Sequence, residues 1–359
     1  MSGVRNPAVS LVVASYEMAR VLPRTLRSLL PPYQRDLDPD MVEIIVVDNG
    51  SSVLPDTGSF ESLGAVIRLI SVAHPTPSPV PAVNAGIAAA RANLIGVWID
   101  GARLASPGLV GACLKAATLH QRPVIATVNY QLGPTRQYLS AQNGYGPGIE
   151  DALLDSIGWP DDDGYRLFDI ATCEVRGGPT GAMLESNALF LPRDLWQELG
   201  GYDPAFVEPG GGMVNPDTLI RACGLPDVQL IRILGEGTFH QYHGGLSTST
   251  ADGAMHTAER DMLDEIAEIF GVPQARLATI IDRHDPDAAC PPCKILGLSP
   301  DATLEEGRRR WRELIREHHP DRAIAAGLPK EAIRLAETRT RAINDAWQRF
   351  RATHEPRTT

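Results

Sequence analysis

Four short apolar runs dominate the first hundred residues of the chain. They read AVSLVVAS, VEIIVVD, VIRLISV and LIGVWID, at residues 8–15, 42–48, 66–72 and 94–100. Nearly continuous runs rich in β-branched residues are typical of strands buried on both faces of a sheet. Segments with helical patterns lie between them, at residues 21–30 and 81–93. This alternation predicts an α/β domain built on a parallel, doubly wound sheet.

The pattern changes after residue 120. Residues 121–181 are rich in Gly, Pro, Tyr and Asp, which predicts an irregular region whose loops cover the ligand site. Order returns with SNALFLPRDLWQELGG, which predicts a short strand followed by a helix that stops at Gly200 and Gly201. VQLIRIL, at residues 228–234, predicts a further strand.

A helical, acidic stretch over residues 251–285 ends in the Pro- and Asp-rich sequence DRHDPDAACPPC. That break predicts a domain boundary. We therefore expect three parts: a first domain over residues 1–250, a helical linker over 251–289 and a small all-α domain over 290–355.

The last part of the chain has a three-helix pattern. Thr303 and Glu306 fit a capping box at the start of a helix. One face of that helix is apolar and the opposite stripe is basic, and a later helix repeats apolar residues at heptad-like spacing. The apolar face comprises Leu304, Trp311, Leu314 and Ile315, the basic stripe Arg308, Arg312 and Arg316, and the later repeat Ala336, Ile343, Trp347 and Phe350. The pattern predicts an antiparallel helical hairpin whose connecting loop contains HHPDR.

Polar residues end three of the predicted strands. Ser15, Asp48 and Asp100 each follow an apolar run directly. In open α/β sheets, ligands bind beyond the carboxyl ends of the parallel strands. We therefore expect these three side chains to converge on one crevice.

Composition favours a folded protein in a reducing compartment. The chain has 359 residues, of which 43% are hydrophobic and 21% charged, so it can bury a substantial core. Its five cysteines are odd in number and mostly far apart, which disfavours a secreted disulfide framework. Cys290 and Cys293 form a C-x-x-C without a second pair at zinc spacing, so we interpret them as linker cysteines. With neither a signal sequence nor a transmembrane run apparent, we expect a cytoplasmic location.

The net charge of −11 is unevenly distributed. Residues 290–359 hold 14 Lys and Arg against 10 Asp and Glu, about +4, whereas residues 1–289 hold 19 against 34, about −15. An acidic main domain argues against nucleic-acid binding, because neutralising phosphates needs a basic face. The contrast also suggests two modules with different partners.

Residues 1 to about 245 resemble a family 2 glycosyltransferase of the GT-A (Rossmann-like) fold. The resemblance rests on LVVASY, EIIVVDNGSS, VNAGIAAARANLIGVWID and LESNALFLPRDLWQELGGYDPAF taken together. It implies a nucleotide-diphospho-sugar donor and transfer to an acceptor hydroxyl with inversion. Transfer requires the negative charge of the leaving diphosphate to be stabilised, and a divalent cation commonly does this.

The same resemblance implies a donor and metal site. Donor-binding residues would be Ser15, Asp48, Asn84, Asp100 and Arg103, with Asp48 near the base or ribose. Asp100 matches the first acid of the metal-binding D-x-D, and His240 or His243 matches the late histidine ligand for Mn²⁺ or Mg²⁺. Ala102 stands at the second acid position, so Arg103 is an alternative group for contacting the phosphates.

The catalytic base implied by the family is a carboxylate on the acceptor side. In EPGGGMVNPDTLIRAC, Asn215 stands at its position and Asp217 matches the following acid. Because Asn cannot accept a proton at neutral pH, we take Asp217 as the first candidate and Glu208 as the second.

Residues 293 to 351 resemble a J-domain, the Hsp70-activating module of DnaJ-type co-chaperones, in its DjlA type. KILGLSPDATLEE, RRRWRELIREHHPDR and RTRAINDAWQRF carry the resemblance. It implies contact with a DnaK-type Hsp70 through His319, Pro320 and Asp321, with Arg308, Arg312 and Arg316 steering the association. Two functions stay open: an active glycosyltransferase with a chaperone module, and a catalytically inactive GT-A scaffold that acts as an Hsp70 co-chaperone or adaptor.

Overall fold

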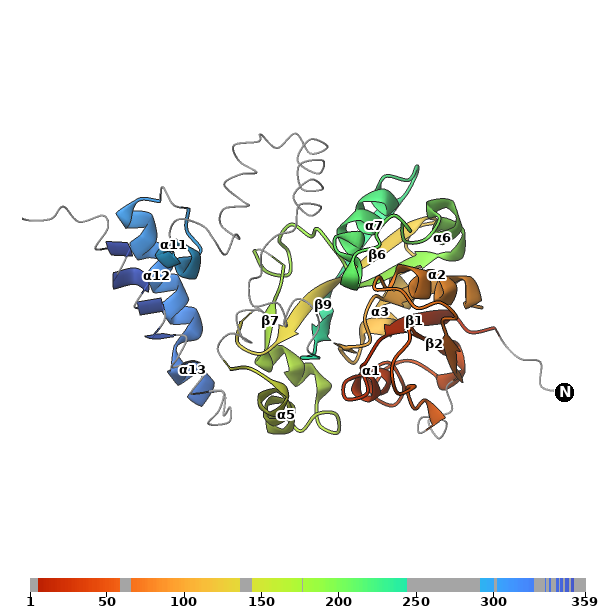
Figure 1. Cartoon of the computed structure of the whole chain (residues 1–359), viewed down its shortest axis with the longest axis horizontal. Coiled ribbons are helices and arrows are strands. Elements are labelled where there is room, and N and C mark those ends of the chain that lie inside the picture. The colour runs from red at the N-terminus through yellow and green to blue at the C-terminus, as the bar shows by residue number, and fades with distance from the viewer. Residues whose placement is uncertain are drawn as a thin grey trace, which may run out of the picture. The chain divides into compact units, whose positions relative to one another are not determined.

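The computed structural model describes residues 6–58, 66–135, 144–175, 177–243, 291–299 and 302–325, with scattered residues between 333 and 351. The chain divides into two compact units (Figure 1). The first comprises Met1–Gln137 and Ile157–Leu246, and the second Tyr138–Ser156 and Ser247–Thr359. The predicted linker at 251–289 lies outside the described residues.

The first half of the chain forms a parallel sheet, as the sequence predicts. Its strands are β1 (Val9–Ser15), β2 (Val42–Asp48), β3 (Val66–Ser71) and β4 (Leu94–Trp98), in the order β3-β2-β1-β4. Neighbours in this order pair in parallel. Every residue of β1, β2 and β4 is buried, which explains their continuous apolar sequences. The expectation of burial on both faces is wrong for β3, which lies at the end of the strand order and is exposed at both of its ends.

Beyond β4 the sheet becomes mixed, which the sequence did not predict. It adds β5 (Arg103–Ala105), β6 (Pro123–Leu132), β7 (Ala171–Cys173), β8 (Ala188–Pro192) and β9 (Gln229–His240). β8 is antiparallel to both β4 and β6, and β9 pairs in parallel with β6 and antiparallel with β5. This half brings the end of β9 beside β5, a pairing that becomes important at the site.

The prediction of an irregular region over residues 121–181 is wrong in its first part. All ten residues of β6 are buried within the sheet. Its polar residues Thr127, Asn129 and Gln131 are buried as well, and each forms hydrogen bonds inside the sheet. A strand with this composition lacks the apolar continuity that marks β1 and β2. The region also contains α5 (Pro147–Ser156), which falls in the second unit, and the 3₁₀ helix η3 (Gly164–Ile170).

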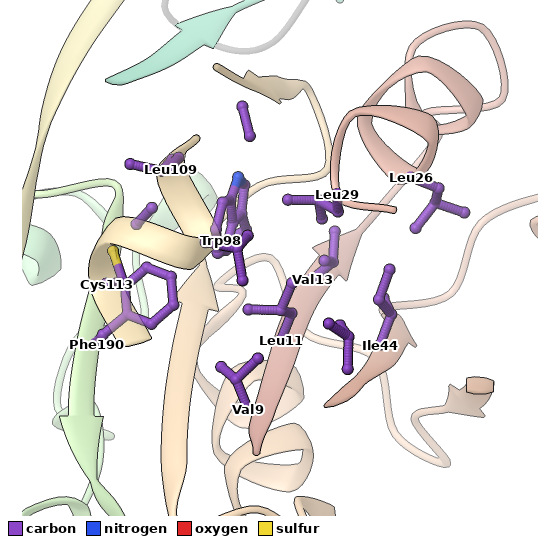
Figure 2. Packing of buried hydrophobic residues seen from close by; sticks show 14 of the residues in the cluster. Val9, Leu11, Val13, Leu26, Leu29, Ile44, Trp98, Leu109, Cys113 and Phe190 are labelled. Carbon is purple, nitrogen blue, oxygen red and sulfur yellow. The ribbon is translucent and has the colours of Figure 1, made fainter. Parts of the chain in front are cut away.

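Helices cover both faces of the sheet. One apolar cluster packs α1 (Leu22–Ser28) and α3 (Leu109–Ala116) against Val9, Leu11 and Val13 of β1 (Figure 2). The other packs α2 (Val80–Ala89), α6 (Arg193–Leu199) and α7 (Val214–Cys223) against Val12 and Ala14. The alternation along β1 divides its side chains between two cores.

Local signals in the sequence are realised at several element ends. α6 stops at Gly200, whose φ of 75° is the left-handed conformation expected for a helix C-cap. Gly96 in β4 allows a close approach, because a Cβ there would overlap the ring of Phe190. Two 3₁₀ turns, η1 (Pro39–Met41) and η4 (Pro209–Gly211), complete the described elements of this unit.

The second unit contains the predicted helices α11 (Pro291–Leu296) and α12 (Leu304–His318). Thr303 and Glu306 form the predicted capping box. The apolar residues of the last segment are buried in the core of this unit, and the three arginines of the basic stripe are exposed. The buried residues include Leu296, Leu314, Ala336, Ile343, Trp347 and Phe350. The exposed ones are Arg308, Arg312 and Arg316.

The His-Pro-Asp sequence differs from the predicted loop. His319 caps α12 in an extended conformation, and Pro320 is already the first residue of a further short helix, α13 (Pro320–Ala325). Proline suits a first helical position, because its fixed φ is helical and its missing N–H needs no partner there. His319 and Asp321 are both exposed.

Cysteine state and membrane character add two observations. Cys293 is disulfide-bonded, which the sequence analysis did not predict. Cys113, Cys173 and Cys223 are free. Over the described residues, no helix combines the length and the apolarity needed to cross a bilayer.

Candidate active site

The carboxyl ends of β1, β2 and β4 lie at one edge of the sheet. Ser15 and Asp48 are register partners at the ends of β1 and β2. β1 and β4 pair in parallel up to Val13 and Trp98. Ser15 follows Val13 by two residues and Asp100 follows Trp98 by two residues, so the two lie at the same level. The register therefore places the three predicted strand-end residues along the same edge.

Asp48 and Ser15 each have, at this edge, a buried polar atom without a partner in the part of the chain that the structure describes. Oδ2 of Asp48 accepts hydrogen bonds of 3.1 Å from the backbone N–H groups of Gly50 and Ser51, which holds the following turn. Oδ1 of Asp48 and Oγ of Ser15 are buried and bond to none of the described residues. Buried polar atoms normally have partners, so an unpartnered pair at a strand edge indicates a place for a ligand.

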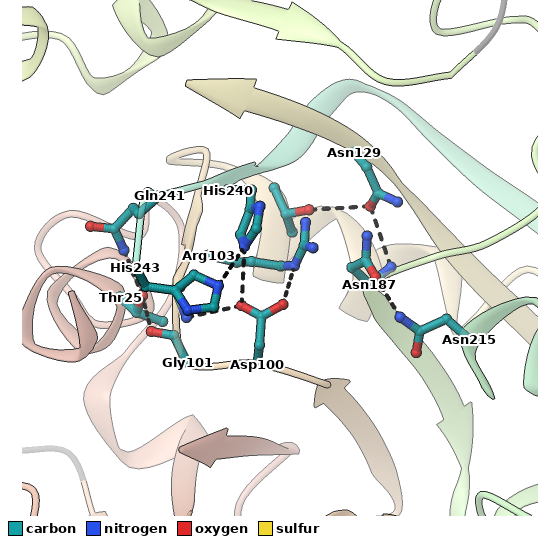
Figure 3. Close-up of polar contacts among 12 residues, drawn as sticks. Thr25, Asp100, Gly101, Arg103, Asn129, Asn187, Asn215, His240, Gln241 and His243 are labelled. Carbon is teal, nitrogen blue, oxygen red and sulfur yellow. Dashed lines mark hydrogen bonds and ion pairs between the residues drawn. The ribbon is translucent and has the colours of Figure 1, made fainter. Parts of the chain in front are cut away.

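Asp100 lies at the centre of a strand-end cluster that we define as Asp100, Arg103, His240 and His243 (Figure 3). Its Oδ2 accepts from Nε of Arg103 at 2.8 Å, and its Oδ1 accepts from the N–H of Ala102 at 3.0 Å. Burial alone would raise the pKa of Asp100, but the charge of Arg103 and then the two histidines hold it below its usual value. The carboxylate is therefore ionised at neutral pH.

Arg103 is a buried cation with spare hydrogen-bonding capacity. It is only 7% exposed, and within β5 it is the register partner of His240. Burial opposes its charge, but Asp100 and then Glu174 raise the pKa of the guanidinium, with Glu185 adding to them. Its Nη1 is buried and has no hydrogen-bond partner in the described chain.

The two histidines face each other beside Asp100. Their Nε2 atoms are 3.1 Å apart, and Nε2 of His240 lies 4.0 Å from Oδ1 of Asp100. Burial, followed by the charge of Arg103, holds the pKa of His240 well below its usual value. Burial also lowers the pKa of His243. Both imidazoles are therefore neutral at pH 7.

Gln131 of β6 decides the tautomer of His240. Its Nε2 donates to the backbone oxygen of His240 at 3.1 Å, which leaves its Oε1 beside Nδ1 of the ring at 3.2 Å. An amide oxygen can only accept, so Nδ1 carries the proton and Nε2 presents a lone pair. His243 then donates its Nε2–H to that lone pair.

The strand-end cluster does not fit a divalent cation held by the protein. No set of three or more His, Cys, Asp and Glu side chains among the described residues is arranged to hold a metal ion. Both oxygens of Asp100 accept hydrogen bonds, and the Nε2 atoms of His240 and His243 point at each other. Ala102, at the position of the second acid, is completely buried in the apolar cluster beneath α1.

Asn84 has a structural contact in place of the predicted donor contact. From α2 its Nδ2 donates to the backbone oxygen of Tyr202 at 2.8 Å, and its Oδ1 accepts from the N–H of the same residue at 2.9 Å. A Cβ at Gly201 would overlap this amide. Asn84 thus fixes the turn that follows α6.

The two candidate bases lie outside the strand-end cluster. Oδ2 of Asp217 accepts from Nε of Arg221 at 2.7 Å, one helical turn along α7. Arg221 also donates to the backbone oxygens of Leu199 and Gly201, so the pair ties α7 to the end of α6. Glu208 is exposed immediately before η4. Asp217 in this pairing has a structural role, which weakens its assignment as base.

A partly buried carboxylate that the sequence analysis missed, Glu185, belongs to this region. Its charge interacts with Arg103, Glu174 and Asp100, and it forms a hydrogen bond with Asn187. Burial is the main reason that the pKa of Glu185 is raised. The available signal was its position three residues before the apolar run of β8, because the other predicted site residues are also polar residues next to buried strands.

Asn187 also connects Glu185 to Asn215, which stands at the position where a catalytic base was expected. Nδ2 of Asn215 donates to Oδ1 of Asn187, and the N–H of Asn187 donates to Oδ1 of Asn129 at 3.3 Å (Figure 3). Oδ1 of Asn215 is buried and has no partner within the described part of the chain. A line of amides therefore runs from β6 across β8 to the start of α7.

Comparisons with known proteins show two separate similarities. No family model matches the chain. It is 27% identical over 119 residues to the co-chaperone protein DjlA of Shewanella oneidensis and 26% identical over 126 residues to that of Escherichia coli. These alignments cover 30% and 29% of this chain and 45% and 46% of the relatives, so the chain spans about half the length of the curated relatives it matches.

Among solved structures, the chain is similar to S. aureus TarS. One match has a TM-score of 0.45 at 12% identity and covers 95% of this chain and 54% of that chain. A second, TarS 1-349 in complex with UDP-GlcNAc, has a TM-score of 0.44 at 13% identity and covers 97% of this chain and 93% of that chain.

Proposed function

We propose that the chain is an inverting glycosyltransferase that uses a nucleotide-diphospho-sugar, joined to a J-domain that contacts a DnaK-type Hsp70 in the cytoplasm. One observation carries the enzymatic part. Where the parallel strands end and β5 begins, Ser15, Asp48 and Arg103 each have a buried polar atom that bonds to nothing in the described part of the chain. A nucleoside diphosphate has donors on its base and ribose and acceptors on its phosphates, which can form hydrogen bonds with these atoms.

Residues at this edge of the sheet bind both the nucleoside and the diphosphate of the donor. Asp48 accepts from a base or ribose hydroxyl, and Ser15 is available to either partner, since a hydroxyl both donates and accepts. Arg103 carries the positive charge that the diphosphate needs as it leaves. The acceptor hydroxyl attacks the anomeric carbon in line, the bond from that carbon to the phosphate oxygen breaks, and the nucleoside diphosphate departs with the electron pair.

We assign the acceptor-side base to Glu185. A base must accept the proton of the attacking hydroxyl, and burial makes Glu185 a stronger base than an exposed glutamate. Its hydrogen bond with Asn187 orients the carboxylate. Asp217 and Glu208 are the alternative bases, and the variants Glu185→Gln, Asp217→Asn and Glu208→Gln separate the three. We expect Glu185→Gln to lower kcat by about 100-fold or more while the other two retain most activity.

The co-chaperone part rests on the exposed His319 and Asp321 at the start of α13 and on the exposed arginines of α12. The relatives named co-chaperone protein DjlA support it. Stimulation of ATP hydrolysis by a DnaK-type Hsp70 tests it. We expect His319→Gln to abolish the stimulation and added salt to weaken it. Undiminished stimulation by the variant would contradict the assignment.

A second candidate function is a scaffold without catalysis. It is favoured by Asn215 at the family base position and by the commitment of Asp217 to Arg221. Thermal unfolding with UDP and GDP, with and without Mn²⁺, separates the two functions. The enzyme predicts stabilisation by at least one nucleotide, since a ligand that binds only the folded state raises the melting temperature. No shift with either nucleotide would favour the scaffold.

A further inference from the structure

We propose that Arg103 takes the place of a divalent cation at the diphosphate, so that this chain binds a nucleoside diphosphate without a metal ion. The inference rests on the proposed function, because it concerns the same donor. It adds which group neutralises the negative charge of the diphosphate as it leaves.

The guanidinium of Arg103 has the chemistry for this task. Its planar fork can donate two parallel hydrogen bonds to phosphate oxygens, which adds geometric specificity to the charge. Nε is already bound to Oδ2 of Asp100, which fixes the plane of the fork, whereas Nη1 is buried without a partner among the described residues. Asp100 therefore orients the guanidinium of Arg103. In a metal-dependent enzyme the same acid would be a metal ligand.

The backbone holds Arg103 rigidly. β5 pairs with the end of β9, with Arg103 opposite His240. The side chain is 8% exposed, so much of its conformational freedom is lost on folding. A donor that is ordered before the ligand arrives costs less to engage on binding.

The surrounding groups disfavour a cation in the same place. A metal at Asp100 would lie close to the positive charge of Arg103 and would be repelled by it. The second acid position cannot assist, because the side chain of Ala102 lies completely buried among apolar groups. The only imidazoles of the cluster, His240 and His243, direct their Nε2 atoms at each other.

The test is calorimetric titration of the full-length chain with UDP, GDP and inorganic pyrophosphate, in EDTA and in Mn²⁺. We expect at least one of these probes to bind in EDTA, with a dissociation constant that Mn²⁺ changes by less than about threefold. Arg103→Gln should weaken binding about 10-fold or more, and Arg103→Lys should fall between, because lysine keeps the charge and loses the fork.

Arg122→Gln is the matched control. Arg122 is also a partly buried, ion-paired arginine, 2.7 Å from Glu198. It lies directly before the first residue of β6, Pro123, and outside the strand-end cluster. We expect its binding constants to equal those of the unsubstituted chain. Should Arg103→Gln fail to fold, Arg103→Lys and Asp100→Asn decide: metal-free binding should survive Asp100→Asn in weakened form.

The outcomes distinguish a failure of the role proposed for Arg103 from a failure of the proposed nucleotide-sugar site. Binding that disappears in EDTA and returns with Mn²⁺ would overturn the role of Arg103 and leave the nucleotide-sugar site intact. Absence of binding by every probe, with or without Mn²⁺, would remove both. Ala102→Asp adds an independent check, because we expect it to destabilise the fold without creating Mn²⁺ binding. A stable variant that gains Mn²⁺-dependent binding would contradict the inference.

Discussion

Gln131 holds His240 at two points. Its Nε2 donates to the backbone oxygen of His240 at 3.1 Å, and its Oε1 lies 3.2 Å from Nδ1 of the ring. Gln131 is completely buried, so it cannot release the ring without leaving polar atoms unpaired. It acts on the site through the histidine.

This arrangement predicts the effect of Gln131→Glu. A carboxylate beside Nδ1 favours the imidazolium, so the pKa of His240, which burial lowers in the native chain, should rise. NMR titration of the imidazole nitrogens measures it directly. The control is Gln34→Glu, since Gln34 is also buried but bonds to Ser28 and Ser106. An unchanged His240 titration in Gln131→Glu would contradict the role of Gln131.

The depressed histidine pKa values predict how stability depends on pH. The folded state resists protonation of His240 and His243, whereas the unfolded chain protonates near pH 6.5. Below that pH the unfolded state binds more protons, so the free energy of unfolding should fall. Each histidine contributes about 1.4 kcal/mol per pH unit at most while the pH lies between its folded and unfolded pKa values.

Urea unfolding at pH 7.5 and pH 5.5 measures this loss. His240→Gln should make the stability less sensitive to pH over that interval, because it removes one of the two groups. His120→Gln replaces an exposed histidine and serves as the control. Equal pH dependence in His240→Gln and the native chain would show that His240 does not cause the slope.

At the opposite end of β2, Glu43 predicts a large stability effect. Its side chain is completely buried; Oε1 accepts from Ser10 Oγ and the Arg91 N–H, both at 2.5 Å, and Oε2 accepts from Nε of Arg91 at 2.7 Å. Glu43→Leu would leave buried donors without acceptors. We expect a loss of about 2–4 kcal/mol in the free energy of unfolding, measured in urea. Glu198→Leu removes the exposed carboxylate of the Arg122 ion pair and should cost less than about 1 kcal/mol.

In the second unit, we expect Gly307→Ala to destabilise α12, although helix propensity alone favours alanine. Gly307 is the fourth residue of α12, and replacing a helical glycine with alanine gains up to about 1 kcal/mol from propensity. A Cβ there would overlap the ring of Phe350 and approach Trp347 at 3.2 Å, and overpacking costs about 1–3 kcal/mol. We expect Gly307→Ala to reduce amide exchange protection in α12 of the full-length chain. Arg309→Ala, on the exposed face, should leave protection unchanged.

Local pattern was sufficient for the parallel half of the sheet and for the helix ends. Residues 8–15, 42–48 and 94–100 are apolar on both faces because β1, β2 and β4 are covered on both faces. The capping box at Thr303 and the stop at Gly200 likewise depend only on adjacent residues. β6 escaped detection because its buried Thr127, Asn129 and Gln131 find their partners on other strands.

The sequence by itself determined which polar residues end the parallel strands, since a strand's end and its direction are local properties. Only the tertiary structure decided what those residues contact. The pairing of β5 with β9 brings Arg103 to His240, and the packing of Ala102 into the apolar core removes the second acid position from the site. Contacts between residues more than a hundred positions apart depend on how the whole sheet is assembled, and no local pattern encodes them.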